Sequence, residues 1–501
     1  MDIKRAKKEI QDAIEAYLLK DIYGEYQIPV IRQRPILLMG PPGVGKTQIM
    51  EQIAKECGIN LVAYTITHHT RQSAVGLPFI REKIYGTQTY SVTEYTMSEI
   101  IASVYEKMER TGIREGILFI DEINCVSETL APMMLQFLQC KTFGNQQVPE
   151  GWIIVAAGNP PEYNKSVREF DVVTLDRIKR IDVEADFTVW KEYAYKVGIH
   201  PAIIAYLELR KDHFYRIENT VDGKLFATAR GWEDLSRLII TYELLGKKVD
   251  REVVHQYIQH WKIAKDFANY LELYEKYKKD YGLERILAGE FTADTLEKLK
   301  FAAFDERLSV VGLLTGKLGE WFRTAWLTDQ CVTELFGQLK HFQKLLEEHP
   351  DSDFAQTVRK AEAAYDAKRK AEQMGHLEDQ TAKRVTQILE QYELRLKEEH
   401  RTGMAAMERL KELFAVENEK REKEIARISE GLLHAFDFME QAFGDSQEMV
   451  VFVTELNTNY YSIQFIQANG CDPYYRYNKE LIFGETREQL LREMDEIEKT
   501  L

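Results

Sequence analysis

The segment that most constrains the fold of this chain is GPPGVGKT, at residues 40–47. It directly follows the short apolar run PILLM and precedes QIMEQIAKEC, in which apolar residues recur at helical spacing. A glycine-rich loop between a strand and a helix turns several backbone N–H groups toward one point, and such a point suits a phosphate group. The segment therefore predicts a P-loop, which holds the phosphates of a nucleotide.

Two side chains at the end of this loop have separate expected roles. Lys46 supplies a positive charge for the β- and γ-phosphates, and the hydroxyl of Thr47 is an oxygen ligand for Mg²⁺. The predicted nucleotide-binding residues are Gly40, Pro41, Pro42, Gly43, Val44, Gly45, Lys46, Thr47 and Gln48.

Two further motifs place polar side chains directly after apolar runs. GILFIDEIN, at 116–124, leads into Asp121 and Glu122, and WIIVAAGNP, at 152–160, leads into Asn159. We expect Asp121 to bind Mg²⁺, Glu122 to polarise the attacking water, and Asn159 to contact the γ-phosphate or that water. Taken alone, an acidic pair or an asparagine before a proline is often only a turn. The P-loop in the same chain favours the catalytic interpretation.

Five apolar runs rich in Ile, Leu and Val alternate with helical patterns in the first part of the chain, at 35–39, 61–66, 116–120, 152–157 and 180–185. Continuous apolar runs are typical of parallel strands that are covered on both faces. We therefore expect an α/β P-loop NTPase with a five-stranded parallel sheet, a small helical lid and a long, mainly α-helical C-terminal region.

The later part of the chain favours long helices, because only Pro350 and Pro473 lie beyond Pro201. Apolar residues within 351–445 recur every three or four positions, which predicts amphipathic or coiled-coil helices. These helices could pack as an antiparallel hairpin or form an arm that binds a partner. The predicted segments are 1–187 (α/β nucleotide-binding domain with an N-terminal helix), 188–250 (lid), 251–350 (helical domain), 351–445 (long helices) and 446–501 (mainly helical module).

The order of the P-loop, LFIDE, AAGNP and LDRI, followed by TARGWEDLSRLI at 228–239, resembles an AAA+ ATPase. Within that group it looks like the MoxR and dynein-related branch of the helix-2-insert clade, over about half of the chain. The resemblance implies ATP as the nucleotide and a ring of subunits, commonly a hexamer. It also implies family roles for single residues, namely Lys46 and Thr47 in Walker A, Asp121 and Glu122 in Walker B, Asn159 as sensor 1 and Arg230 as the sensor 2 arginine of the lid.

The segment TLDRIKR, at 174–180, contains a candidate arginine finger. The family's usual Asp-Arg-Phe is similar to Asp176-Arg177-Ile178 here, which leaves open whether Arg177 or Arg180 is the working arginine. Lys46 and Arg230 already serve the nucleotide of their own subunit, so we expect Arg177 to act on the nucleotide of a neighbouring subunit. The alternative is a surface arginine paired with Asp176.

Two predicted inserts carry aromatic residues. GLPFIREKIYGTQTY, at 76–90, falls where the family places a loop that faces the pore of the ring, and KTFGNQQVPEGW, at 141–152, resembles the hairpin before sensor 1. Phe79, Tyr85 and Phe143 are therefore candidates for contacting a substrate. Aromatic residues in hairpins also often pack locally.

Composition argues against several other classes of protein. The net charge of −15 disfavours a surface built to neutralise nucleic-acid phosphates. The five cysteines form no Cys-x-x-Cys pair, so neither a disulfide framework nor a zinc knuckle is indicated. The N-terminal segment lacks a signal-peptide core, and no apolar run reaches the length of a membrane span. We expect a cytoplasmic protein.

Three functions remain open from the sequence. The leading one is a ring-forming, Mg²⁺-dependent, MoxR-like ATPase that remodels a protein partner in a chaperone-like way, and the family implies a partner with a von Willebrand A domain. The alternative is the NTPase motor of a nucleic-acid-directed restriction or anti-phage system. A third is a scaffold that binds ATP without useful turnover, with the long helices as its functional part.

Overall fold

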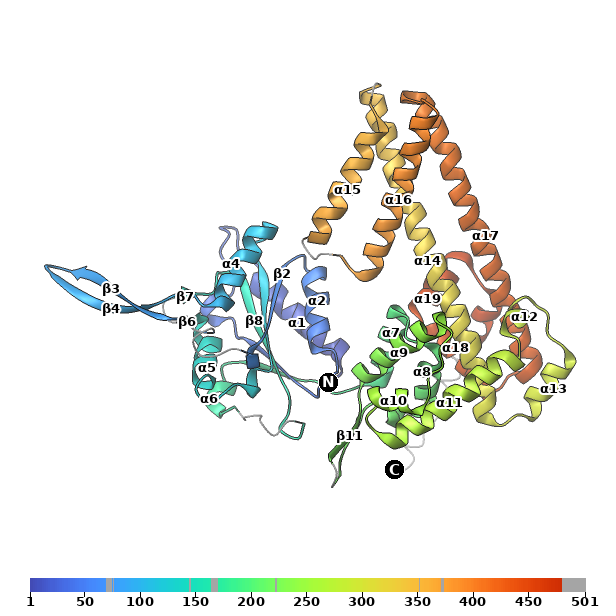
Figure 1. Cartoon of the computed structure of the whole chain (residues 1–501), viewed down its shortest axis with the longest axis horizontal. Helices are drawn as coiled ribbons and strands as arrows, with labels where there is room; N and C mark the ends of the chain where they lie inside the picture. Colours follow the sequence, from blue (N-terminus) through green and yellow to red (C-terminus); the bar gives the residue numbers. More distant parts are fainter. Residues whose placement is uncertain are drawn as a thin grey trace, which may run out of the picture. The chain divides into compact units, whose positions relative to one another are not determined.

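The computed structural model describes residues 1–68, 74, 76–143, 146–163, 170–220, 223–350, 352–370 and 374–479. They form two compact units (Figure 1). The first unit holds Met1–Val189 and Thr228–Arg230. The second holds Trp190–Ala227, Gly231–Lys370 and the described residues from Met374 onward.

The centre of the first unit is a five-stranded sheet in the order β2-β5-β8-β1-β9, with every neighbouring pair parallel. This confirms the predicted parallel sheet. Its strands are β1 (Ile36–Met39), β2 (Asn60–Thr65), β5 (Gly116–Asp121), β8 (Trp152–Gly158) and β9 (Lys179–Asp182).

Helices cover both faces of this sheet (Figure 1). Successive side chains of a strand point to opposite faces, so Ile117 and Phe119 of β5 pack with α1 (Ile3–Leu18) and α2 (Lys46–Glu56). Leu118 and Ile120 pack instead with α4 (Glu99–Thr111) and α5 (Ala131–Cys140). Burial on both faces explains why the strand sequences are continuously apolar.

Short elements connect the larger ones. The remaining strands form three antiparallel hairpins, β3 (Pro78–Tyr85) with β4 (Gln88–Tyr95), β6 (Thr142–Phe143) with β7 (Gln146–Gln147), and β10 (Arg216–Thr220) with β11 (Gly223–Ala227). The third hairpin lies within the segment 188–250 that was predicted as a helical lid, and its two strands pair from Arg216 with Ala227 to Thr220 with Gly223. The short helices are η1 (Val30–Arg32), η2 (Ile66–His68), η3 (Ile123–Cys125), α6 (Val172–Leu175) and η4 (Lys211–His213).

The second unit is mostly helical. Its shorter helices are α7 (Phe187–Val197), α8 (Pro201–Leu209), α9 (Ala229–Leu244), α10 (Arg251–Tyr257), α11 (Trp261–Asp280), α12 (Leu283–Leu287) and α13 (Ala293–Phe301), and α7 and α9 begin at the unit boundary. Its later helices are α14 (Phe304–Glu348), α15 (Phe354–Lys370), α16 (His376–Glu398), α17 (Gly403–Phe443), α18 (Gln447–Thr458) and α19 (Tyr460–Asn469). Residues 480–501, the end of the predicted C-terminal module, lie outside the described residues.

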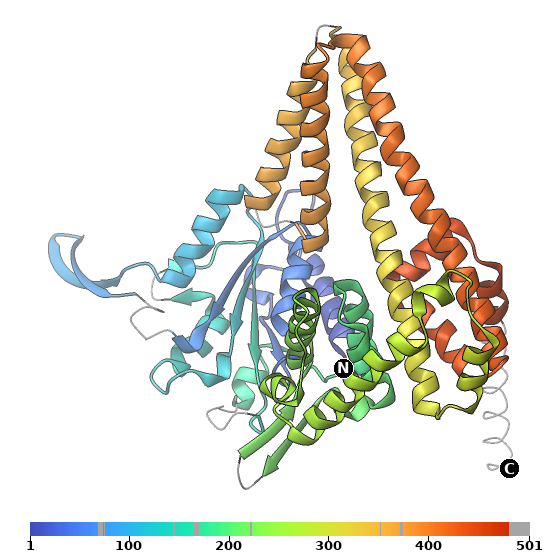
Figure 2. The same ribbon diagram turned by 45° about the vertical axis from the view of Figure 1, so that its right-hand side comes forward.

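The long helices pack along their length (Figures 1 and 2). With 45 residues and about 1.5 Å of rise per residue, α14 is roughly 68 Å long. Leu339 and Phe342 of α14 share one apolar core with Val358 of α15, Leu389 of α16 and Leu410 of α17. Among the described residues, no helix is both long enough and apolar enough to cross a membrane.

Candidate functional site

Most of the predicted nucleotide-binding and catalytic residues lie at one edge of the sheet. Strands β1, β5 and β8 are adjacent and parallel, so their carboxyl ends lie together. The P-loop follows β1, Asp121 ends β5, and Asn159 follows β8. Ligands of doubly wound sheets bind at this edge, and the tertiary structure therefore joins three motifs that are far apart in sequence.

Glycines shape the P-loop where other residues would be strained or would collide. Gly43 and Gly45 have φ angles of 78° and 91°, in the left-handed region that favours glycine. A Cβ atom on Gly40 would lie 2.8 Å from the carbonyl oxygen of Val183. Gly45 caps α2, so the loop leads straight into the amino end of that helix, where backbone N–H groups suit an anion.

Lys46 is held at the base of this loop and is only 8% exposed. Its Nζ donates hydrogen bonds to the carbonyl oxygens of Gly40, at 2.8 Å, and Pro41, at 2.9 Å, and to Oδ1 of Asn159, at 3.0 Å. Burial lowers the pKa of Lys46 to about 8, and the positive charge of Arg230 acts in the same direction. The ammonium group is therefore fixed in position but poorly compensated, which suits it to bind phosphate.

Thr47 and Asp121 form the part of the site that fits Mg²⁺. The Thr47 hydroxyl donates a hydrogen bond to Oδ2 of Asp121 at 3.1 Å, so two hard oxygen donors lie side by side. Among the described residues, no group of three or more His, Cys, Asp or Glu side chains could hold a metal ion. Mg²⁺ in nucleotide sites is bound by one or two protein oxygens together with phosphates and water, and the Thr47–Asp121 pair fits that pattern.

Glu122 lies directly after the strand in an uncommon backbone conformation. Its φ is 57°, in the left-handed region, and its backbone N–H donates to Oδ1 of Asp121 at 2.9 Å. The hydroxyl of Thr67 donates to Oε2 of Glu122 at 3.0 Å. Strained residues persist where surrounding contacts hold them; the first bond holds the backbone of Glu122 beside Asp121, and the second holds its carboxylate. The sequence reading had assigned no role to Thr67.

Asn124 is a second residue that sequence reasoning missed. It is 2% exposed, and its Nδ2 donates to the carbonyl oxygen of Asn159 at 2.8 Å, while its Oδ1 accepts from the Asn159 N–H at 3.2 Å. A Cβ atom on Gly158 would lie 2.7 Å from that Oδ1, so glycine is required for the approach. Asn124 thus holds the backbone of Asn159 in place. The sequence feature that could have indicated this role is the position of Asn124 in GILFIDEIN, three residues after Asp121.

Arg230 also lies near the P-loop. Residues Thr228–Arg230 cluster with the first unit, and a Cβ atom on Gly43 would lie 3.4 Å from the Cβ of Arg230. The side chain is exposed, and its charge reaches Lys46, whose pKa it lowers. Arg230 is therefore close enough to the loop to reach a phosphate there.

Arg177 and Arg180 lie in different surroundings. Arg177 is exposed, and its Nη1 donates to the neutral Oε1 of Gln139. Arg180 forms an ion pair with Asp182, in which Nη2 and Oδ1 are 2.8 Å apart. Ile178, which stands at the third position of the Asp-Arg-Phe pattern, is 4% exposed and belongs to the core.

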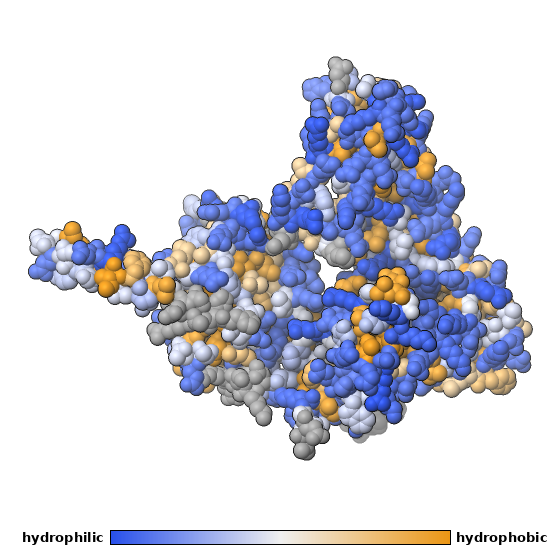
Figure 3. All heavy atoms as spheres, viewed as in Figure 1, coloured by the Kyte–Doolittle hydropathy of each residue, from blue (hydrophilic) through white to orange (hydrophobic). Residues whose placement is uncertain are grey.

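The two hairpins differ in what they present to solvent. Hairpin β3–β4 projects from the first unit (Figure 1), and apolar side chains lie along it (Figure 3). Phe79 and Tyr85 are 42% and 58% exposed, so both can reach a partner. Phe143 cannot: it is 2% exposed and stacks on Phe137, with ring centroids 3.9 Å apart. Local packing therefore overturns the substrate-contacting role considered for Phe143.

Comparisons with known proteins agree on the class of the first unit. The model of the family "ATPase family associated with various cellular activities (AAA)" matches residues 36–178. The chain is 34% identical over 120 residues to ATPase family gene 2 protein homolog A of Homo sapiens, covering 24% of this chain and 11% of that protein. It is 40% identical over 55 residues to the ATP-dependent zinc metalloprotease FtsH of Hahella chejuensis, covering 11% of this chain and 9% of that protein.

The matched segments span only about a tenth of those two relatives. Among solved structures, the chain is similar to a RuvB mutant of Thermotoga maritima, with 16% identity and a TM-score of 0.28, over 59% of this chain and 85% of that one.

The matched range of 36–178 starts at the first residue of β1 and contains the P-loop, Asp121, Glu122 and Asn159. The sheet order and the convergence of these motifs at one edge agree with that match. Residues 36–178 thus form a nucleotide-binding domain of the AAA ATPase family.

Proposed function

We propose that the chain is a ring-forming, Mg²⁺-dependent, MoxR-like ATPase that hydrolyses ATP at subunit interfaces and uses the cycle to remodel a protein partner. Lys46 binds the β- and γ-phosphates, Glu122 polarises the attacking water, and Asn159 orients that water or the γ-phosphate. Thr47 and Asp121 hold Mg²⁺, which when bound offsets the charge of the phosphates. Arg230 contacts the same nucleotide.

The observation that carries the ring assignment is the place of Arg177, two residues before the edge strand β9. Strand β9 runs parallel to β1, with Lys179 beside Ile36 and Asp182 beside Met39. Arg177 precedes β9 and therefore lies beyond the amino end of β1, whereas the P-loop begins at its carboxyl end. About 10 Å of strand, at roughly 3.3 Å per residue, separates the two ends before the extra residues are added.

Arg177 thus lies at the opposite end of β1 from the P-loop of its own subunit. An arginine supplied by a neighbour stabilises the charge that develops on the transferred phosphate, and such a finger is worth about 10³ to 10⁵ in rate. Arg180 is less suited to this role, because Asp182 already neutralises it. We therefore assign the finger to Arg177.

Contacts within the second unit support coupling between the lid and the C-terminal helices. Lys191 of α7 is buried and pairs with Glu208 of α8, at 2.7 Å, and with Glu455 of α18. Tyr195 of α7 donates to the same Glu455. A Cβ atom on Gly316 of α14 would lie 2.5 Å from the Pro201 side chain of α8, so α8 and α14 pack closely. Any movement of the lid would carry the long helices with it.

The partner side of this proposal is a protein, and by family resemblance one with a von Willebrand A domain. The exposed Phe79 and Tyr85 of hairpin β3–β4 are the proposed contacts. DNA is the competing partner: if DNA raised ATP turnover, and the binding weakened steeply with salt, the protein-remodelling assignment would be wrong.

Mixing two inactive variants tests the interface. Arg177→Ala should bind ATP normally but hydrolyse it at least about a thousandfold more slowly, and Lys46→Ala should lack turnover because it binds ATP weakly. In an equimolar mixture, about a quarter of the interfaces of a closed ring combine an intact Lys46 with a neighbour's intact Arg177. Turnover should therefore return in the mixture. Arg180→Ala is the matched control and should keep its activity; full turnover of Arg177→Ala alone would refute the finger assignment.

A further inference from the structure

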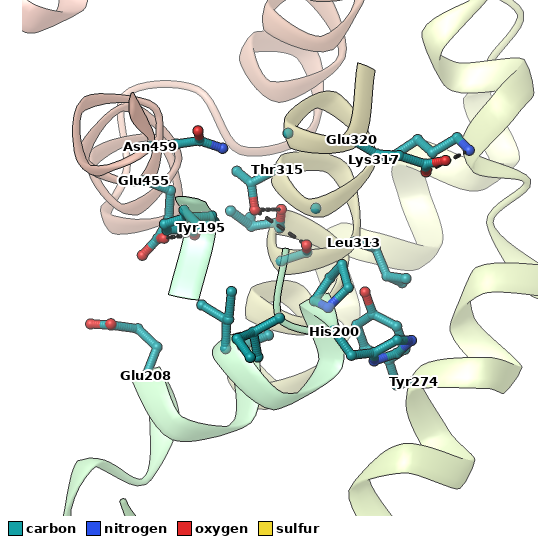
Figure 4. Close-up of a pocket in the computed structure, with 18 of the residues that line it drawn as sticks. Tyr195, His200, Glu208, Tyr274, Leu313, Thr315, Lys317, Glu320, Glu455 and Asn459 are labelled. Carbon is teal, nitrogen blue, oxygen red and sulfur yellow. Dashed lines mark hydrogen bonds and ion pairs between the residues drawn. The ribbon is translucent and has the colours of Figure 1, made fainter. Parts of the chain in front are cut away.

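A cavity of about 1000 Å³ lies within the second unit, between α7, α8, α9, α11, α14 and the junction of α18 with α19 (Figure 4). Its volume is at the upper end of the range of small-molecule pockets, about 300–1,000 Å³. Much of its wall is apolar, including Ile199, Ile204, Ile240, Leu313 and Val451. The cavity can therefore enclose an apolar body of considerable size.

The carboxylates that line this cavity already have cationic partners. The pairs are Glu208 with Lys211 at 2.8 Å, Glu243 with Lys278 at 3.8 Å, Glu320 with Lys317 at 2.9 Å, and Glu455 with the buried Lys191. Both oxygens of Glu455 are engaged, because Tyr195 donates to the second one (Figure 4). A cationic ligand would thus have to displace an existing partner.

Arg323 of α14 is the exception among the charged residues of the wall. Within the part of the chain that the structure describes, no carboxylate oxygen lies within 4.0 Å of its guanidinium nitrogens. Its Nε is buried and makes no hydrogen bond to any described residue. The guanidinium does contact the Tyr461 side chain, which is neutral. The cavity therefore has one positive charge without a counter-charge.

The backbone around Arg323 is shaped to keep the guanidinium in place. A Cβ atom on Gly198 would lie 2.1 Å from its Nη1, so only glycine leaves room there. Gly198 has a φ of 78° and follows the last residue of α7. The negative end of a helix dipole favours a cation near that point, but it supplies no full charge.

Asn459 adds a second hydrogen-bond donor to the same wall. Its Oδ1 accepts from the N–H groups of Tyr461 and Ser462, at 3.0 and 3.4 Å. Its Nδ2 would lie 2.8 Å from a Cβ atom on Gly319, one turn before Arg323 on the same face of α14. Figure 4 shows the amide nitrogen of Asn459 pointing toward α14. No described residue accepts a hydrogen bond from that nitrogen.

We propose that this cavity binds an amphipathic organic anion, a small molecule with one carboxylate head and an apolar body. Arg323 and Asn459 bind the head, and the apolar wall buries the body. A single negative charge completes the charge balance. A polyanion such as a nucleotide would place excess negative charge near Glu208, Glu320 and Glu455, which is unfavourable. The proposal does not depend on the ATPase assignment.

The test compares two probes of equal chain length, decanoate and decanol, by titration calorimetry on the full chain without nucleotide. Decanoate should bind with a stoichiometry of one and at least tenfold more tightly than decanol, because only decanoate pairs with the guanidinium. Arg323→Gln should weaken decanoate binding by about tenfold or more and leave decanol unchanged. Lys317→Gln is the matched control, since Lys317 lines the cavity but pairs with Glu320, and it should bind decanoate as the unmodified chain does.

A second variant tests the cavity itself. Val451→Trp adds bulk to the apolar wall and should weaken both probes, while Arg323→Lys keeps the charge and should retain part of the decanoate affinity. Thermal unfolding establishes that each variant folds. Equal affinity for decanoate and decanol, binding of neither, or an Arg323→Gln variant that is less stable but binds decanoate normally would overturn the proposal. In the last case Arg323 would serve only the end of α7.

Discussion

The Nζ of Lys46 donates a hydrogen bond to Oδ1 of Asn159 at 3.0 Å, although 113 positions separate the two residues in the chain. The bond links the P-loop after β1 to the residue that follows β8. The cation and the polar side chain are thereby held beside each other at the edge of the sheet where the P-loop begins. The geometry of the site consequently depends on the contacts that hold Lys46 and Asn159 in place.

Nucleotide binding should take up protons near pH 8. Burial lowers the pKa of Lys46 to about 8 from 10.5, so about half of these side chains are neutral at that pH. Phosphates favour the charged form and raise the pKa, so binding at pH 8 should absorb about half a proton. Titration calorimetry in buffers of different ionisation enthalpy measures this uptake. It should vanish at pH 6 and in Lys46→Ala; equal uptake at both pH values would contradict the assignment.

Asn124→Ala should lower kcat by about tenfold and change KM little. Asn124 holds the backbone of Asn159 through two hydrogen bonds. Its own side chain is buried, so it does not bind the nucleotide directly. If Asn159 is no longer held in place, the rate of hydrolysis should fall more than the affinity for ATP. Steady-state kinetics measures the split. The matched control is Asn60→Ala, which removes an equally buried asparagine that donates to the carbonyl oxygen of Ile113. If both variants lowered kcat alike, the effect would be one of stability.

Thr67→Val should raise the basal rate of ATP hydrolysis by about two- to fivefold. The Thr67 hydroxyl donates to Oε2 of Glu122 and competes for the carboxylate that must polarise the attacking water. Thr67→Ser keeps the hydroxyl and should behave like the unmodified chain. In the Glu122→Gln background, where turnover is expected to be abolished, Thr67→Val should have no effect. A lower rate for Thr67→Val would show that the bond assists Glu122 instead.

Lys141→Met should stabilise the first unit. Lys141 is 6% exposed, its Nζ donates to the neutral Oε1 of Gln33 at 3.3 Å, and burial lowers its pKa to about 8 from 10.5. Between these pKa values the unfolded chain binds more protons, so stability rises with pH across that window. Below pH 8 the buried charge lowers the free energy of unfolding by up to about 3 kcal/mol, and the hydrogen bond to Gln33 offsets part of this loss.

Urea unfolding at pH 7 and pH 10 measures this effect. The free energy of unfolding of Lys141→Met should exceed that of the unmodified chain by about 1–3 kcal/mol at pH 7, and the gain should shrink at pH 10. Lys397→Met removes an exposed lysine of the second unit and should change little at either pH. A gain that did not depend on pH would point to packing rather than charge.

Local sequence patterns were enough to predict the centre of the fold. The glycine spacing of the P-loop follows from φ angles that few residues other than glycine adopt, as at Gly43 and Gly45. Continuous apolar runs marked the strands, because both faces of the sheet are covered. Residues that directly follow such strands were expected to share one edge, and Asp121 and Asn159 do so. The β10–β11 hairpin was missed, since its strands are mostly exposed and their pattern is weak.

The amino-acid sequence by itself therefore determined which strands are followed by the polar side chains of the site, and that these side chains lie at the carboxyl ends of the strands. Strand and loop patterns of this kind are encoded within a few neighbouring residues. Only the tertiary structure decided that Asn124 holds Asn159, that Phe143 is buried, that Arg177 lies at the opposite end of β1 from the P-loop, and that Lys191 meets Glu455. These relationships depend on register and on packing between distant segments, and no spacing along the chain specifies either.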